Sequence, residues 1–174
     1  MQFWGQIVSI AAMAIIIVSF QCKSTKMFVA VKGVGALLSV ISFFLLGNPV
    51  SAVFNLIAFV WSFISLNAKW KNKYTFIFFT VLYLIATLIT FEKTLSFVSL
   101  WAFLFMFVQI ADLYSVIFGD GKLIRNMRLF LISPAWLINN TVIVFSIGGA
   151  LCEVFIMVSV IVSFVRFRKT GFEQ

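Results

Sequence analysis

The sequence predicts an all-α, polytopic membrane protein with seven transmembrane helices, arranged as two parallel three-helix repeats joined by a linker helix. Three observations lead to this fold class. Of the 174 residues, 63% are hydrophobic and only 10% are charged, whereas a soluble domain carries about 25% charged residues. Long apolar runs recur along the whole chain, and basic residues gather in alternate connections between them. A water-soluble domain is therefore excluded.

The predicted spans follow from the length of the apolar runs. A helix needs about 17–25 mostly apolar residues to cross a bilayer, and such runs lie at 3–20, 27–46, 50–67, 74–91, 95–118, 128–146 and 148–166. Polar or turn-forming residues separate them, at 21–26, 47–49, 67–73, 92–93, 119–121 and 148–149. We therefore expect helices joined by short connections.

The distribution of the thirteen Lys and Arg residues predicts the orientation of the chain. Only Lys93 falls on one side of a seven-span arrangement, and the others fall on the opposite side. Because basic connections stay in the cytoplasm, we expect the N-terminus outside and the C-terminus inside. The cytoplasmic residues form four groups: Lys23, Lys26 and Lys32; Lys69, Lys71 and Lys73; Lys122, Arg125 and Arg128; Arg166, Arg168 and Lys169.

A shift of the sequence by 101 residues reveals a candidate internal repeat. It lays the second and third runs over the sixth and seventh without a gap, and Phe44, Gly47 and Val53 over identical residues. We therefore expect a single transmembrane domain, 1–174, made of a first triplet (1–67), a linker helix (68–94) and a second triplet (95–174). Parallel repeats of this kind favour a site at their interface, and the linker helix need not touch a solute.

Short segments of the first triplet resemble the YgjV-type bacterial inner-membrane proteins: SFQCKSTK at 19–26, FFLLG at 43–47 and VFN at 53–55. The 3+1+3 plan with an outside N-terminus is similar to that of SWEET sugar facilitators, PnuC vitamin carriers and PQ-loop proteins. The YgjV-type resemblance implies a multi-pass protein of the bacterial inner (cytoplasmic) membrane without an assigned substrate, and the similarity to the carriers implies a transport function. The PQ-loop signature is absent because the chain has no Pro-Gln pair. SWEET-like proteins have hinge prolines in several spans, whereas only Pro134 lies inside a predicted span here, so the resemblance does not extend to a sugar-type rocking mechanism.

Four polar residues in the outer half of the predicted spans are candidate substrate-binding residues: Asn55, Asn139, Asn140 and Glu153. Polar side chains in a span usually face a partner or a water-filled cavity. Amides suit a neutral polar solute because they both donate and accept hydrogen bonds, and a carboxylate suits a cation or a proton. The alternatives are that the Asn side chains join helices and that Glu153 reaches the outer interface.

Lys32 and Asp112 lie at matching depths in the inner half of the second and fifth spans. Their opposite charges predict an ion pair, which would reduce the cost of inserting either one. Such a pair could act as a cytoplasmic gate between the triplets, with Gln109 one turn away on the same face. The alternative is that Lys32 extends its ammonium group to the membrane interface.

Trp61 and Trp136 lie deep in the third and sixth spans, unlike the tryptophans near the predicted membrane surfaces. They are candidates for stacking walls around a solute. Packing in the core or against lipid is the alternative.

The residue inventory argues against enzymatic chemistry. The sequence has no histidine and only Cys22 and Cys152 as thiols, on opposite sides of the predicted bundle. A Ser–His or Cys–His dyad is therefore impossible, and we expect no enzyme, no cofactor and no metal site.

The function that the sequence favours is a small-solute carrier or facilitator that works by alternating access between the triplets. A non-transporting receptor or scaffold subunit is the alternative. The expected partners are the lipid bilayer, a small polar solute and a second copy of the chain, and no nucleic acid.

Overall fold

The computed structural model describes residues 2–90, 97–168 and 171, and the elements in this part of the chain are helical. The all-α prediction is thus confirmed. The α-helices are α1 (Gln2–Phe20), α2 (Thr25–Leu45), α3 (Pro49–Ile64), α4 (Lys73–Thr90), α5 (Phe97–Phe118), α6 (Gly121–Met127), α7 (Ser133–Ile138) and α8 (Ile147–Arg166). A 3₁₀ turn, η1 (Ala68–Trp70), precedes α4.

Seven helical segments of the described chain correspond to the seven predicted spans, because α6 and α7 belong to one continuous segment over 121–143. Four helices are long and apolar enough to cross a membrane by themselves: α1, α2, α5 and α8. The helices α3 and α4 are shorter but also apolar. The segment over 121–143 is interrupted by two π turns, η2 (Arg128–Ile132) and η3 (Asn139–Ile143).

The sixth segment begins earlier than predicted, and this corrects the placement of two arginines. Asp120 caps the segment, since its side chain accepts a hydrogen bond from the backbone N–H of Leu123 at 2.7 Å. An acidic N-cap satisfies free N–H groups at a helix start, so helix begins at Gly121 instead of at residue 128. Arg125 and Arg128 therefore lie in helical structure and are buried, and their assignment to the fifth connection was wrong.

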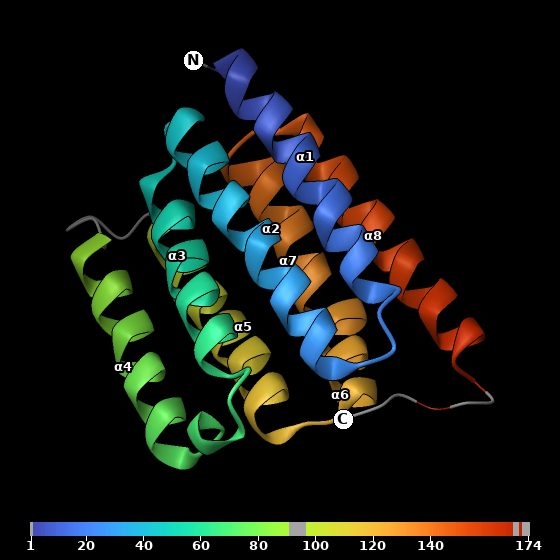
Figure 1. Cartoon of the computed structure of the whole chain (residues 1–174). Coiled ribbons are helices and arrows are strands. Elements are labelled where there is room, and N and C mark those ends of the chain that lie inside the picture. Colours follow the sequence, from blue (N-terminus) through green and yellow to red (C-terminus); the bar gives the residue numbers. More distant parts are fainter. Residues whose placement is uncertain (1, 91–96, 169–170, 172–174) are drawn as a thin grey trace.

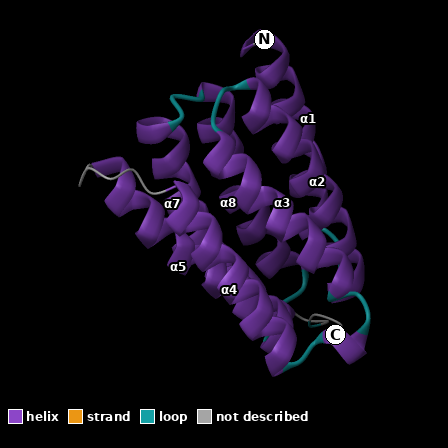
Figure 2. Ribbon diagram, turned by 90° about the vertical axis from the view of Figure 1, so that its left-hand side faces the viewer, coloured by secondary structure: helices purple, strands orange, loops and turns teal. Residues whose placement is uncertain are grey.

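The helices form two layers, with α4 along one edge (Figures 1 and 2). In one layer α2 lies between α1 and α3, and in the other the 121–143 segment lies between α8 and α5. The layers meet where α1 packs on α8 and α3 packs on α5, and α4 contacts α3 and α5. In a two-fold repeat, α1 would correspond to α5 and α3 to α8. The contact between α1 and α8 would then correspond to the contact between α5 and α3. This contact pattern agrees with the 3+1+3 plan, which stays a prediction.

The layer α1–α2–α3 is closely packed because small residues lie between its helices. A Cβ atom at Gly35 would overlap the side chain of Ile16 on α1. The hydroxyl of Ser42 on α2 donates a hydrogen bond to the carbonyl of Gly5 on α1 at 2.9 Å. Small residues that allow helices to approach are typical of membrane bundles.

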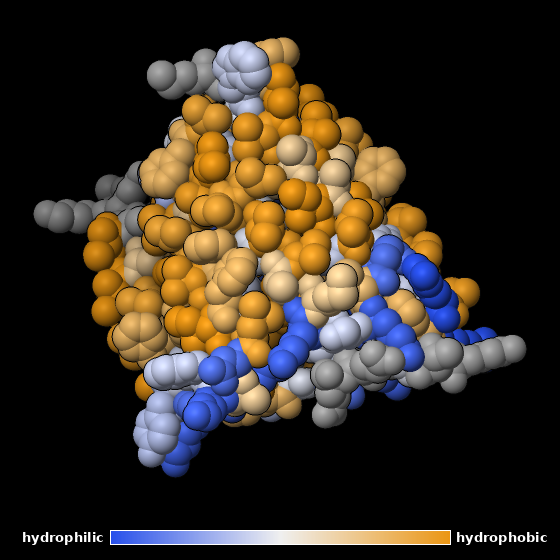
Figure 3. Space-filling view, viewed as in Figure 1, coloured by the Kyte–Doolittle hydropathy of each residue, from blue (hydrophilic) through white to orange (hydrophobic). Residues whose placement is uncertain are grey.

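Hydrophilic residues gather at one end of the bundle. The α1–α2, α3–α4 and α5–α6 connections and the last turn of α8 all lie at this end (Figure 1), and the lower part of Figure 3 shows hydrophilic atoms below an apolar surface. Burial and the neighbouring Lys26 lower the pKa of Lys71, so the first and third connections approach each other. The basic connections thus share one end, and the positive-inside rule predicts that this end is cytoplasmic.

Candidate functional site

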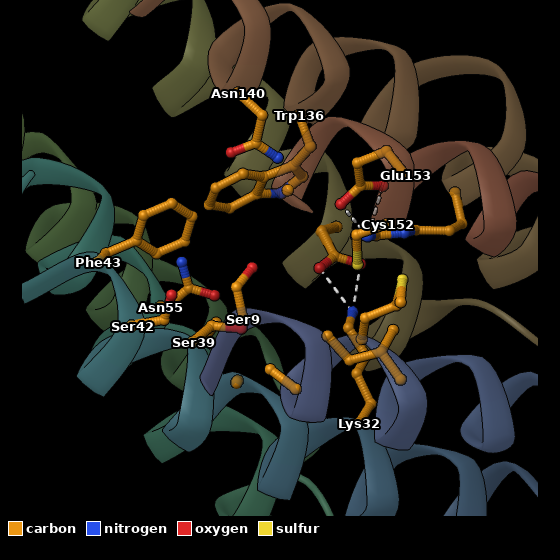
Figure 4. Close-up of a pocket in the computed structure, with 18 of the residues that line it drawn as sticks. Ser9, Lys32, Ser39, Ser42, Phe43, Asn55, Trp136, Asn140, Cys152 and Glu153 are labelled. Atoms are coloured by element: carbon orange, nitrogen blue, oxygen red, sulfur yellow. Dashed lines mark hydrogen bonds and ion pairs between the residues drawn. The ribbon is translucent and has the colours of Figure 1, made fainter. Parts of the chain in front are cut away.

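A cavity of about 60 Å³ lies between the two layers. Its lining comes from every segment except α4, as far as the structure describes that helix. The polar residues among those that line it are Ser9, Lys32, Ser39, Ser42, Asn55, Gln109, Asp112, Arg128, Asn140 and Glu153 (Figure 4). A cavity needs roughly 10–15 Å³ of such volume to hold one water, so this cavity has room for more than one water or for a compact solute.

Lys32 and Asp112 form the predicted ion pair across the two layers. The Nζ atom of Lys32 donates to the carboxylate oxygens of Asp112 at 2.8 and 2.6 Å, and both residues are buried. Lys32 lies on α2 and Asp112 on α5, so this pair bridges the two helix layers. The structure therefore excludes the alternative in which Lys32 reaches the membrane interface. The gating role of the pair stays a prediction.

Arg128 and Glu153 form a second ion pair that sequence reasoning missed. The Nη2 atom of Arg128, in the π turn η2, donates to both oxygens of Glu153 on α8 at 3.0 Å. Both residues are buried, so Glu153 does not extend to the outer interface. The signal that could have revealed Arg128 is the helix-start pattern at Asp120 and Gly121, which places Arg128 two turns into a helix.

The two ion pairs belong to one site. Lys32 interacts electrostatically with both Arg128 and Glu153, and Figure 4 shows the two pairs beside one another along the cavity. The predicted outer-half and inner-half sites are therefore joined. Removing one partner of a buried pair costs about 3–5 kcal/mol because it leaves an uncompensated charge. In each of the two pairs, the burial of one charged residue therefore depends on the presence of the other.

The predicted amide residues divide between the cavity and the helix contacts. Asn55, Gln109 and Asn140 line the cavity. Asn139 does not: its amide nitrogen donates to the hydroxyl of Ser51 at 3.3 Å, and its oxygen accepts from the indole of Trp101 at 3.3 Å. Asn139 thus joins three helical segments, which is the alternative role considered for these residues.

Three polar atoms at the cavity have no hydrogen-bond partner among the described residues. They are Nε of Arg128, Nε2 of Gln109 and Oδ1 of Asn140, and all three are buried. Buried polar atoms in native structures are normally hydrogen-bonded, so each unsatisfied one calls for an explanation. Two donors and one acceptor at the same cavity are what a bound polar molecule would satisfy.

The two candidate tryptophans take different places. Trp136 lines the cavity, where its ring stacks on Phe43 with a centroid distance of 5.6 Å. Trp61 is buried outside it, and its indole donates to the hydroxyl of Tyr83 on α4 at 3.1 Å. Trp61 still contacts the site, because the Nζ atom of Lys32 lies 5.2 Å from its ring centroid.

The π turns of the sixth segment position two of the cavity residues. Each turn begins next to a functional side chain, Arg128 in η2 and Asn139–Asn140 in η3, and Pro134 lies between the turns. Proline lacks an N–H group and disturbs regular helix, and π turns are frequent at functional sites. Arg128 and Asn140, one in each π turn, both line the cavity.

Arg125 is a further buried residue that was not predicted. Its guanidinium donates to the carbonyls of Cys22 at 2.8 Å and Gly121 at 3.0 Å, and to the hydroxyl of Ser163 at 3.1 Å. These bonds connect the end of α1 to α6 and α8 near the basic end of the bundle. Arg125 does not line the cavity, so we assign it a structural role.

No group of three or more Cys, Asp or Glu side chains that could hold a metal ion lies together in the described part of the chain. Cys152 lines the cavity, whereas Cys22 lies at the end of α1. The polar groups of the cavity lining are thus two ion pairs, amides, hydroxyls and the thiol of Cys152.

Comparison with known proteins identifies the family. The family model Imp-YgjV, described as a bacterial inner membrane protein, matches residues 3–171. The chain therefore belongs to this family of bacterial inner-membrane proteins. Neither the curated proteins nor the solved structures include a significant match.

Proposed function

We propose that this member of the Imp-YgjV family is a carrier that moves a small polar solute across the inner membrane by alternating access. The observation that carries the proposal is the cavity between the two helix layers, lined by the buried ion pairs Lys32–Asp112 and Arg128–Glu153. Ionisable residues within a membrane span are expensive and usually mark a substrate or ion pathway.

The different connections of the two ion pairs support separate roles in a transport cycle. Lys32–Asp112 joins α2 to α5, so it must break if the first and second triplets separate on that side. Arg128–Glu153 joins two segments of the second triplet and can stay closed while the triplets move. We therefore assign the gate to Lys32–Asp112 and solute binding to Arg128, Glu153 and the neighbouring amides.

The helix arrangement also supports movement between triplets. The cavity lining includes residues of both triplets but no described residue of α4, as expected if α4 only links them. The layers meet through two main contacts, α1 with α8 and α3 with α5. Carriers made of parallel repeats place the solute at such an interface near the middle of the membrane.

The competing function is a receptor or scaffold subunit that transports nothing. The observation that favours it is the small volume of the cavity, about 60 Å³, since typical ligand pockets have about 300–1,000 Å³. A carrier in an occluded state also encloses a small volume. The two functions differ in whether the cavity opens alternately to each side of the membrane.

Uptake by liposomes that contain the purified protein tests the proposal. Labelled sugars, nucleosides, vitamins and amino acids are offered outside, and one of them is expected to accumulate inside faster than in protein-free liposomes. Asp112→Asn is expected to slow this uptake, whereas Lys69→Gln, which removes an exposed charge far from the cavity, leaves it unchanged. If the folded protein moves none of the panel, the receptor or scaffold function replaces the carrier.

A further inference from the structure

The charges that line the cavity are balanced. Of the described residues in its lining, Lys32 and Arg128 are cationic, and Asp112 and Glu153 are anionic. A ligand with a net charge would leave one buried charge without compensation, which is strongly unfavourable away from water. The balance therefore favours a solute whose own charges sum to zero.

The unsatisfied atoms indicate that this solute carries strong acceptors as well as a donor. Nε of Arg128 and Nε2 of Gln109 are free donors, and Oδ1 of Asn140 is a free acceptor. The Nε–H group of Arg128 is not engaged by Glu153, and a charged donor of this kind forms a strong hydrogen bond with a carboxylate. The side of the cavity at Arg128 and Gln109 thus suits a carboxylate, whereas Asn140 together with Glu153 suits an N–H group.

The size of the cavity limits the solute. A volume of about 60 Å³ lies above the roughly 10–15 Å³ that a single water requires and far below the roughly 300–1,000 Å³ of typical ligand pockets, so it suits a molecule with only a few non-hydrogen atoms. A sugar or a nucleoside is too large for this state of the protein.

From these three features we infer that the cavity takes a compact zwitterion, with one ammonium and one carboxylate group on a skeleton the size of glycine. The inference rests on the proposed carrier function and adds the chemical class of the solute. No bond is made or broken: the carboxylate accepts hydrogen bonds from Arg128 and Gln109, and the ammonium donates to Glu153 and Asn140. The total charge in the cavity stays balanced when the solute enters and when it leaves.

Four probes of nearly equal size separate charge from shape: glycine (zwitterion), glycinamide (cation), glycolate (anion) and glycolamide (neutral). Each is offered to the purified protein in a thermal-shift measurement and to liposomes that contain it. Glycine is expected to bind and to be taken up about 100-fold better than glycinamide or glycolate, since each of these leaves one buried charge uncompensated. If glycolamide binds as well as glycine or better, the zwitterion inference is wrong, and a neutral amide or polyol becomes the solute class.

Variants that change the cavity charge by one unit give a second test. Arg128→Gln leaves a net negative cavity and is expected to shift the preference from glycine toward glycinamide. Glu153→Gln leaves a net positive cavity and is expected to shift it toward glycolate. Lys69→Gln, in an exposed connection, is the matched control and keeps the glycine preference. If both folded cavity variants keep the wild-type order of the probes, the charge argument is wrong.

The two readouts separate this inference from the carrier function. Glycine that raises the melting temperature but does not accumulate in liposomes supports the zwitterion site and contradicts transport. Accumulation of a probe other than glycine supports transport and contradicts the zwitterion. If no probe binds and none is taken up, the zwitterion inference fails, and the wider liposome panel decides the carrier function separately.

Discussion

The ammonium group of Lys32 lies 2.6 Å from one carboxylate oxygen of Asp112 and 2.8 Å from the other, although the two residues are 80 positions apart in the chain. This buried pair joins α2 to α5, and with them the two helix layers on either side of the cavity. Its strength should therefore appear both in the stability of the bundle and in the proposed transport.

Asp112→Asn is expected to destabilise the folded protein by about 3–5 kcal/mol, because Lys32 is left buried without its counter-charge. The double variant Lys32→Met/Asp112→Leu removes both charges and should recover most of this stability. It should not recover uptake, since the proposed gate is gone. Thermal unfolding in detergent and liposome uptake measure the two effects. A double variant less stable than Asp112→Asn would contradict the assignment of an interacting pair.

Gly149→Ala is expected to displace Asn140 and weaken solute binding. A Cβ atom at Gly149 would lie 2.8 to 3.0 Å from the amide atoms of Asn140, closer than such atoms pack. The effect should vanish in an Asn140→Ala background, where nothing remains to be displaced. A double-mutant cycle on the thermal shift caused by the solute measures this coupling. Additive effects of the two substitutions would show that Gly149 acts by another route.

Trp61→Phe is expected to lower stability by about 0.6–2 kcal/mol, the range for a polar contact between membrane helices, because it removes the hydrogen bond to Tyr83. Tyr83→Phe should cost a similar amount, and the double variant little more than either single one. Uptake is expected to change little, since Trp61 does not line the cavity. Trp136→Phe, at the cavity wall, is the contrasting variant and should slow uptake. Equal effects on uptake would contradict the distinction between the two tryptophans.

The orientation predicted from the basic connections can be checked in cells. Alkaline phosphatase, which is active only outside the cytoplasm, is expected to be active when fused before Gln2 and inactive when fused after Gln174. Green fluorescent protein at the same two places should show the reverse pattern. Matching activity at both ends would indicate an even number of spans and would contradict the seven-span arrangement.

Much of the fold follows from the sequence because membrane insertion depends on local properties. The length of an apolar run decides whether it can cross the bilayer, and the helices found at the first five runs and the last one lie within a few residues of the predicted ranges. The Lys32–Asp112 pair could also be predicted from the sequence. A charged side chain within an apolar span needs a partner, and these two opposite charges lie at equal depth.

The start of the sixth segment was not predictable from hydropathy. Residues 121–128 carry three basic residues, so they resemble a polar connection as long as the partner of Arg128 is unknown. The structure shows that Asp120 starts the helix early and that Glu153 neutralises Arg128 within the bundle. The residues next to Arg128 in sequence suggest a loop, but Arg128 is buried because Glu153 on α8 compensates its charge.

The class of protein, the number of helical segments and the gathering of basic residues at one end follow from the amino-acid sequence alone, because they depend on run length and on the cost of charge in lipid. The direction in which each polar side chain faces became known from the packing of the helices. Asn140 lines the cavity while its neighbour Asn139 joins helices, and Trp136 faces the cavity while Trp61 does not. The physical reason is that π turns and packing set the rotation of each helix, and neither is encoded in local hydrophobicity.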